Sequence, residues 1–273
     1  MHALQGPTVA SGDLNLALFC DFENIALGVR DSNYADFDMR LVVQKLLVKG
    51  SIVVKKAYCD WERYKGYKTA MHEAAFELIE IPHVRQSGKN SADIRMVVDA
   101  LDLCYTKEHI DTFVIISGDS DFSPLVSKLR ENAKTVIGVG VKNSTSDLLI
   151  SNCDEFIFYD DLVRDVPALR TETKPARRLP AAKAPKPQKD RKQEAIDLVL
   201  ETTMALAAER GDTAKLWGSM IKQTLKRRHP GFNESFYGFP SFNDLLEEAQ
   251  TRGHLKLELD DKSGGYIIES MTP

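Results

Sequence analysis

Over about the first 160 residues, short apolar runs alternate with longer amphipathic segments. Strands are expected at 14–20, 52–58, 78–81, 113–116, 135–139 and 155–158. Helices are expected between them at 37–49, 63–77, 91–105 and 123–131, with a short one at 146–150. Strands that alternate with helices are typical of βαβ units. The pattern therefore predicts an α/β domain with a central parallel sheet.

The helix expected at 91–105 has apolar residues at helical spacing. They are Ile94, Val97, Val98 and Leu101, which together form one stripe that we expect to face the sheet. Asp93 lies beside this stripe in the first turn, whereas Asp99 lies away from it and is expected to face solvent.

The last 80 or so residues have a different pattern. Helices are expected at 194–210 and 213–228, and a third begins at Ser241 as its cap and stops at Gly253. Two apolar segments, 255–259 and 265–268, are joined by a turn-forming sequence and read as a β-hairpin. Three helices and a hairpin predict a small winged-helix domain.

Between these parts, residues 164–193 are rich in Pro, Ala and Lys and carry a net charge of +7. This composition predicts an extended, semi-rigid linker. The basic charge is compatible with a polyanion partner and equally with a solvated linker. We therefore expect three parts: an α/β domain at 13–163, a linker at 164–193 and a winged-helix domain at 194–270.

Composition narrows the class of protein. The chain has 273 residues, a net charge of −4 and a 43% apolar fraction. No apolar run approaches the ~20 residues that span a bilayer, and the N-terminus has no secretion-signal pattern. The four cysteines are far apart in sequence and are expected to be buried free thiols, so we expect a cytoplasmic protein without a membrane partner.

Acidic residues follow two of the expected strands. The first strand runs into Asp21 and Asn24, and the strand at 113–116 runs into Ser117, Asp119 and Asp121. The carboxyl ends of parallel strands line the ligand crevice of an open sheet, and these two strands are expected to be neighbours at its centre. We therefore expect one acidic site there, to which Asp93 also contributes.

Such a site is suited to a divalent cation. Hard oxygen ligands favour Mg²⁺ or Mn²⁺, and such a cation can activate water and stabilise charge on a phosphodiester. Asn24 and Ser117 could orient the water or a carboxylate, and Lys89 and Arg95 lie close in sequence to Asp93, where they could meet a phosphate.

Other roles for the same acids remain open. Asp119 or Ser120 could cap a helix, Asp21 could end its strand with an Asx-turn, and Asp93 could complement a helix dipole. A strand-end aspartate also accepts phosphate in response regulators and in haloacid-dehalogenase-like enzymes.

The three motifs Asp21-Phe22-Glu23-Asn24, Ser91-Ala92-Asp93-Ile94 and Ser117–Phe122 resemble the NYN family, a PIN-like ribonuclease group, over about residues 13–163. The resemblance implies a PIN-like Rossmannoid fold. It also implies that Asp21, Asp93, Asp119 and Asp121 bind metal, with Asn24 and Ser117 at the family's matching positions.

The C-terminal part resembles the LOTUS domain, also called OST-HTH, over 216–232, 237–246 and 264–268. The resemblance implies a winged helix that binds RNA or docks onto a partner protein. The residues that could contact RNA are Lys222, Lys226, Arg227 and Arg228 at one helix end, with Tyr237 and Phe239 for base stacking. The alternative is that these aromatic rings belong to the core and that the basic run complements a helix C-terminus.

The leading hypothesis is a metal-dependent ribonuclease, endo- or exonucleolytic, that cuts single-stranded or structured RNA and is targeted by its C-terminal module. A non-catalytic RNA-binding or adaptor protein is the main alternative. A phosphohydrolase acting on small substrates is a weaker one.

Overall fold

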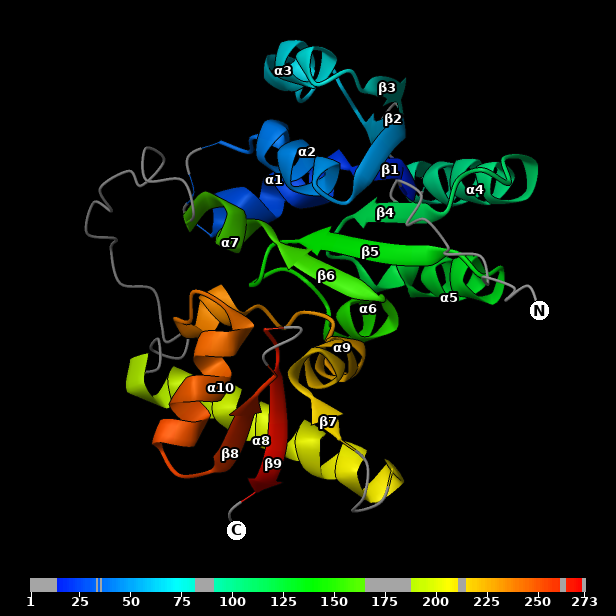
Figure 1. The fold of residues 1–273 in the computed structure, drawn as a ribbon. Helices are drawn as coiled ribbons and strands as arrows, with labels where there is room; N and C mark the ends of the chain where they lie inside the picture. Colours follow the sequence, from blue (N-terminus) through cyan, green and yellow to red (C-terminus); the bar gives the residue numbers. More distant parts are fainter. Residues whose placement is uncertain are drawn as a thin grey trace, which may run out of the picture. The chain divides into compact units, whose positions relative to one another are not determined.

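The computed structural model describes residues 14–32, 34, 36–81, 91–164, 188–210, 215–260 and 264–271. By the density of their contacts the residues form two compact units (Figure 1). Unit 1 comprises residues 1–153 and 157–163, and unit 2 comprises residues 154–156 and 164–273. Most of the linker expected at 164–193 lies outside the described residues. The described part resumes at Gln188 and is already helical there, six residues before the predicted helix start.

A six-stranded sheet forms the centre of the first unit. Its strands are β1 (Leu14–Asp21), β2 (Gly50–Cys59), β3 (Glu77–Glu80), β4 (Thr112–Ile116), β5 (Thr135–Gly140) and β6 (Glu155–Phe158), in the spatial order β3-β2-β1-β4-β5-β6. The pairs β3–β2, β2–β1, β1–β4 and β4–β5 are parallel. The predicted parallel sheet is therefore confirmed, with β1 and β4 adjacent at its centre.

Helices cover both faces of this sheet (Figure 1). They are α1 (Phe22–Asp31), α2 (Met39–Leu47), α3 (Lys68–Glu73), α4 (Ser91–Thr106), α5 (Ser123–Glu131), α6 (Asp147–Asn152) and α7 (Tyr159–Arg164), with short 3₁₀ turns η1 (Lys65–Tyr67) and η3 (Ser120–Phe122). Alternate residues of β1 point to opposite faces. Leu16 and Leu18 join the core under α1 and α2, whereas Phe19 stacks on Phe113 at 5.9 Å.

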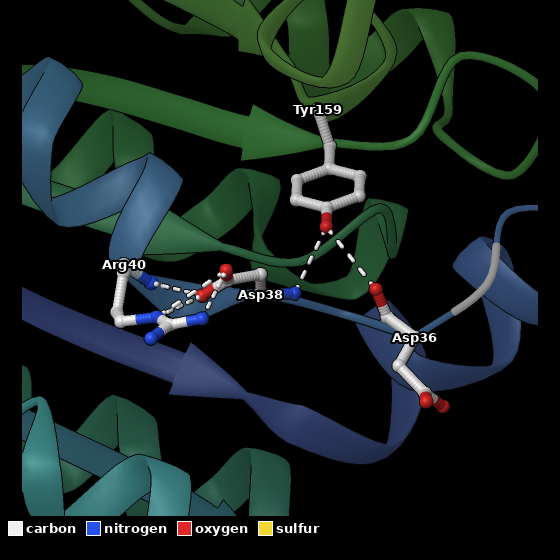
Figure 2. Close-up of polar contacts among 4 residues, drawn as sticks. All are labelled: Asp36, Asp38, Arg40 and Tyr159. Atoms are coloured by element: carbon white, nitrogen blue, oxygen red, sulfur yellow. Dashed lines mark hydrogen bonds and ion pairs between the residues drawn. The ribbon is translucent and has the colours of Figure 1, made fainter. Parts of the chain in front are cut away.

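The loop between α1 and α2 is held by a tyrosine of α7. The Tyr159 hydroxyl accepts the Asp38 N–H at 2.9 Å and donates to the Asp36 carbonyl oxygen at 3.4 Å (Figure 2). Asp38 in turn caps α2, since its carboxylate accepts the backbone N–H of Arg40 at 2.9 Å and pairs with the guanidinium of the same residue. These bonds connect segments more than a hundred residues apart in sequence.

Two helices of this unit differ from the sequence expectation. Helix α1 was not predicted, because the apolar run of β1 continues directly into its buried residues Phe22 and Ile25. The helix expected at 63–77 is only η1 and α3, and the preceding residues are drawn into an aromatic cluster around Phe22.

The expected orientation of α4 is wrong. Met96, Ala100 and Cys104 are its buried residues, whereas Ile94 is 63% and Val98 is 55% exposed. Asp99 does not face open solvent, because it accepts a 2.9 Å hydrogen bond from the Tyr58 hydroxyl and its side chain is only 15% exposed. A stripe of β-branched residues therefore misled the periodicity argument, and the smaller Ala and Cys residues make the close contact with the sheet.

The second unit packs helices against a small antiparallel sheet. Its elements are α8 (Gln188–Arg210), β7 (Leu216–Trp217), α9 (Gly218–Arg228), the 3₁₀ turn η5 (Glu234–Tyr237), α10 (Phe242–Thr251), β8 (Leu255–Leu259) and β9 (Tyr266–Met271). The strand order is β7-β9-β8. The expected hairpin is present, and Ser241 caps α10 by accepting the Asp244 N–H at 3.2 Å. The expected helix 213–228 starts only at Gly218, because Leu216 and Trp217 pair with β9 instead.

Within the described part of the chain, no helix is both long enough and apolar enough to cross a membrane. All four cysteines are free and buried, as the sequence predicts.

The stacked pair Phe19 and Phe113 gives a direct test of the sheet core. Phe113→Ala should lower the free energy of unfolding by about 3–5 kcal/mol, because both rings are fully buried and truncation leaves a cavity. Val48→Ala is the control, since Val48 is 86% exposed and its loss should change stability by about 0.5 kcal/mol or less. Chemical denaturation of both variants makes the comparison, and equal stabilities would contradict this description of the core.

Candidate active site

The acidic residues meet where the order of strands in the sheet reverses. From β1 the chain builds β2 and β3 on one side, and from β4 it builds β5 and β6 on the other. Open α/β sheets bind their ligands at such a switch point, outside the carboxyl ends of the strands. A cleft of about 270 Å³ lies beside the ends of β1 and β2, and Asp21, Asn24, Asp93 and Asp119 are among its lining residues.

Asp21 is the buried centre of the site, at the last position of β1 and only 8% exposed. One carboxylate oxygen accepts the Asn24 N–H at 3.4 Å, which caps α1. The other accepts the hydroxyl of Ser117 at 3.0 Å. Since Ser117 directly follows β4, this hydrogen bond joins the ends of the two central strands.

Asn24 and Ser117 position the loop that follows β4. The side-chain oxygen of Asn24 accepts the Gly118 N–H at 2.8 Å, and the hydroxyl of Ser117 accepts the Asp119 N–H at 3.2 Å. A side chain at Gly118 would lie 2.5 Å from the backbone oxygen of Ser144, so only glycine fits there. The predicted orienting roles of Asn24 and Ser117 are consistent with these contacts.

Asp119 also acts as a cap, as the alternative reading of the sequence expects. One of its oxygens accepts the Asp121 N–H at 3.0 Å at the start of η3. A carboxylate has two oxygens and several lone pairs. Capping and a ligand role are therefore compatible, because Asp119 also lines the cleft.

Asp93 and Asp121 occupy different positions relative to the cleft. Asp93, in the first turn of α4, lines the cleft and is half-buried. Asp121 is exposed and is not among the lining residues, but its charge is close enough to raise the pKa of Asp93. Asp121 thus lies at the edge of the acidic cluster rather than in its centre.

Two further acids line the cleft and were missed from the sequence. Glu23 lies between the two motif residues Asp21 and Asn24, and Asp60 follows β2. Asp60 could have been found by the rule used for Asp21, since it too directly follows a strand that enters the sheet centre. Its strand was expected to end at 58, so the connection was not made.

The crowding of acids raises two pKa values. Burial raises the pKa of Asp21 to about 7, and the charge of Asp93 adds to this. Burial raises the pKa of Asp93 to about 6, with the charges of Asp119 and Asp121 adding to it. Near neutral pH these carboxylates therefore lose free energy by being charged, and a cation among them would recover it.

The donor set is chemically suited to a hard divalent cation, because every candidate ligand is a carboxylate oxygen. Within the described residues, however, no group of three or more His, Cys, Asp or Glu side chains is already gathered in the geometry of a metal site. Asp21, Asp93 and Asp119 share the cleft, so these are the residues that would hold the ion after small side-chain rotations.

The predicted phosphate contacts near Asp93 are only partly described. Lys89 lies outside the described residues. Arg95, one turn into α4, pairs with Asp99 at 3.0 Å and is not among the residues that line the cleft. Its side chain is still 56% exposed.

The expected RNA contacts of the second unit lie around the end of α9. Lys222 pairs with Glu234, and Arg228 pairs with Glu201. Lys226 is half-buried and Arg227 is exposed. The basic residues are thus close together in the last two turns of one helix.

The aromatic residues of this unit serve its core. Phe239 is 3% exposed, so its expected role in base stacking is wrong. Tyr237 stacks on Phe232 at 5.4 Å and meets the edge of Phe236 at 5.0 Å, which makes it half-buried. A contact between Tyr237 and RNA stays a prediction.

Comparison with known proteins places the first unit in a family. The sequence profile of the NYN domain matches residues 15–160. The chain belongs to the NYN domain family. NYN domains are a family of nucleases that are generally dependent on divalent metal ions, so membership supports a nuclease role acting on RNA.

Individual relatives of the NYN domain add the fold but no activity. An uncharacterized protein of Methanocaldococcus jannaschii is 28% identical over 147 residues, which are 54% of this chain and 55% of that protein. The chain therefore matches about half the length of this curated relative. The crystal structure of a protein of unknown function from Vibrio parahaemolyticus has a TM-score of 0.50 at 24% identity and covers 56% of this chain and 97% of that one.

The raised pKa of Asp93 predicts a stabilising substitution. The folded-state pKa of about 6 lies above the ordinary 3.8, so the folded protein holds a proton that the unfolded chain releases. Stability is therefore lost as pH rises from about 4 through 6. Asp93→Asn should raise the melting temperature by about 2–4 °C at pH 8 in chelator, and hardly at pH 4.

Asp102→Asn is the matched control, because Asp102 is an exposed acid on the same helix. Its melting temperature should follow the wild-type protein at both pH values. A gain for Asp93→Asn that is equal at pH 4 and pH 8 would show that the acid is not under electrostatic strain.

Proposed function

We propose that the protein is a divalent-metal-dependent ribonuclease that hydrolyses RNA phosphodiesters in the cleft at the switch point. The observation that carries the proposal is the convergence of Asp21, Asp93 and Asp119 on this cleft in an NYN domain. Asp121 at the edge would complete the predicted ligand set. Mg²⁺ and Mn²⁺ are the cations that such ligands prefer.

Each residue of the chain has a defined part in this proposal. A bound cation would supply the positive charge that stabilises the phosphodiester as negative charge develops on it. The hydrogen bond from Ser117 holds the carboxylate of Asp21 toward β4, and Asn24 holds the Gly118 backbone so that Asp119 faces the cleft. The pKa of Asp21 near 7 also makes this carboxyl able to exchange a proton near neutral pH.

The second unit would hold RNA near the cleft. Its helices and its three-stranded sheet suit a LOTUS-like winged helix, and the basic end of α9 would contact phosphates. A tether would raise the effective concentration of RNA at the NYN domain. The unit could alternatively bind a protein partner.

The rival function is a non-catalytic RNA-binding or adaptor protein. It is favoured by the absence, among the described residues, of side chains already gathered around a metal position. Purified protein incubated with labelled RNA separates the two functions. Products that need Mg²⁺ or Mn²⁺ and disappear with chelator support the nuclease, whereas binding without products supports the adaptor.

Asp119→Asn should abolish cleavage and leave RNA binding nearly unchanged, because the amide keeps the shape of the carboxylate and removes its charge. Asp102→Asn, on the exposed surface of α4, is the control and should cleave like the wild-type protein. Gel analysis of labelled RNA with Mn²⁺ makes the measurement. Retained cleavage in Asp119→Asn would rule out this mechanism.

The double variant Lys226→Gln and Arg227→Gln should weaken RNA binding by about 3- to 10-fold, because each lost phosphate contact releases fewer counterions. Lys256→Gln is the control, since Lys256 is an exposed cation of β8 in the same unit. Binding is measured by fluorescence anisotropy at several salt concentrations. Unchanged affinity of the double variant would favour protein docking at this end of α9.

A further inference from the structure

The segment that follows β2 carries aromatic residues at a spacing of three with cations between them. Trp61, Tyr64 and Tyr67 all contact the ring of Phe22, with ring centroids 5.0, 5.7 and 5.1 Å away. Phe22 is fully buried and lies between the cleft residues Asp21 and Glu23. The aromatic residues therefore anchor this segment directly beside the acidic cleft.

Polar contacts fix the same segment. The Trp61 N–H donates to the Glu80 carboxylate at 3.0 Å, and its indole N–H donates to the Ile79 carbonyl oxygen at 3.1 Å. The Arg63 N–H closes a turn onto the carbonyl oxygen of Asp60 at 3.1 Å, and Asp60 lines the cleft. The backbone that carries Arg63 is thus held relative to the carboxylates of the site.

The side chain of Arg63 lies at the cleft edge. Its Nη1 is 3.1 Å from Oε1 of Glu23, which lines the cleft, while 52% of the Arg63 side chain stays exposed. A guanidinium has five N–H donors, and this contact uses one of them. Donors therefore remain for a second oxyanion, and guanidinium geometry suits phosphate oxygens.

The cleft needs such a cation. Its lining includes five carboxylates, Asp21, Glu23, Asp60, Asp93 and Asp119, which would repel an approaching phosphodiester. Exposed Lys65 lies two residues beyond Arg63, whereas Lys68 is engaged by Glu62 at 2.8 Å. Positive charge at the edge would offset this repulsion and give the strand a fixed direction of approach.

We propose that Arg63 is a phosphate-positioning residue and that the segment Asp60–Lys68 guides single-stranded RNA into the cleft, with the guanidinium holding Glu23 and one phosphate of the strand together. This inference rests on the proposed ribonuclease function for its substrate. It assigns a role to a segment that neither the acidic motifs nor the C-terminal unit includes.

The test measures binding of a fluorescent single-stranded RNA to the full chain with Mg²⁺, in the Asp119→Asn background so that the RNA stays intact. Arg63→Gln should raise the dissociation constant by about 3- to 10-fold and reduce the salt slope by about 0.7, the value for one phosphate on a single strand. Arg63→Lys should restore the slope but only part of the affinity, because the charge returns without the fork.

Two controls separate phosphate binding from a structural role. Lys128→Gln removes a cation with the same exposure, 51%, from an ion pair on α5, and it should change neither affinity nor slope. Glu23→Gln breaks the same ion pair as Arg63→Gln but removes an anion, so it should tighten binding. If the pair were only structural, both substitutions would weaken binding alike.

The outcomes also separate this inference from the proposed function. Wild-type affinity and slope in Arg63→Gln would overturn the role of Arg63 even if the wild-type protein cleaves RNA. Binding that depends on Arg63, in a wild-type protein that cleaves nothing with any divalent cation, would support the inference and remove the ribonuclease. No binding of single-stranded RNA by the starting protein would overturn the inference as well.

Discussion

The buried hydrogen bond between Asp21 and Ser117 is the contact on which the candidate site depends. It joins the ends of β1 and β4, the two strands between which the direction of the sheet reverses. It also buries a carboxylate where burial raises its pKa to about 7. The fold therefore spends stability at this position. A purely structural strand end would have no need of an acid, whereas a cation or a proton-transfer site would.

The surroundings of Asp21 are arranged around the same point. Phe22, the next residue, is the centre of the aromatic cluster that includes Trp61 and Tyr64, and Asn24 holds the Gly118 backbone. Four consecutive residues thus cap a helix, anchor a neighbouring segment, line the cleft and position the opposite loop. Rigid packing of this kind is what keeps charged groups close together despite their repulsion.

The two readings of the aspartates proved compatible. Asp21 and Asp119 are both helix caps, and both line the cleft, because one oxygen of each carboxylate can satisfy a backbone N–H while the group still faces the solvent-filled space. Helix capping and ligand binding share a cause. Both use the free N–H groups and strand ends that meet at one edge of a parallel sheet.

The sequence by itself determined the parallel sheet, the adjacency of β1 and β4 and the placement of Asp21 and Asp119 at their ends, because alternation of apolar runs and strand-end polar residues are local signals. It did not determine the orientation of α4, where Ile94 and Val98 are exposed and Asp99 binds Tyr58. Nor did it reveal Glu23, Asp60 or Arg63 at the cleft. Only tertiary packing decided these, since they depend on which face of a helix fits the sheet and on how aromatic residues distant in sequence gather around Phe22.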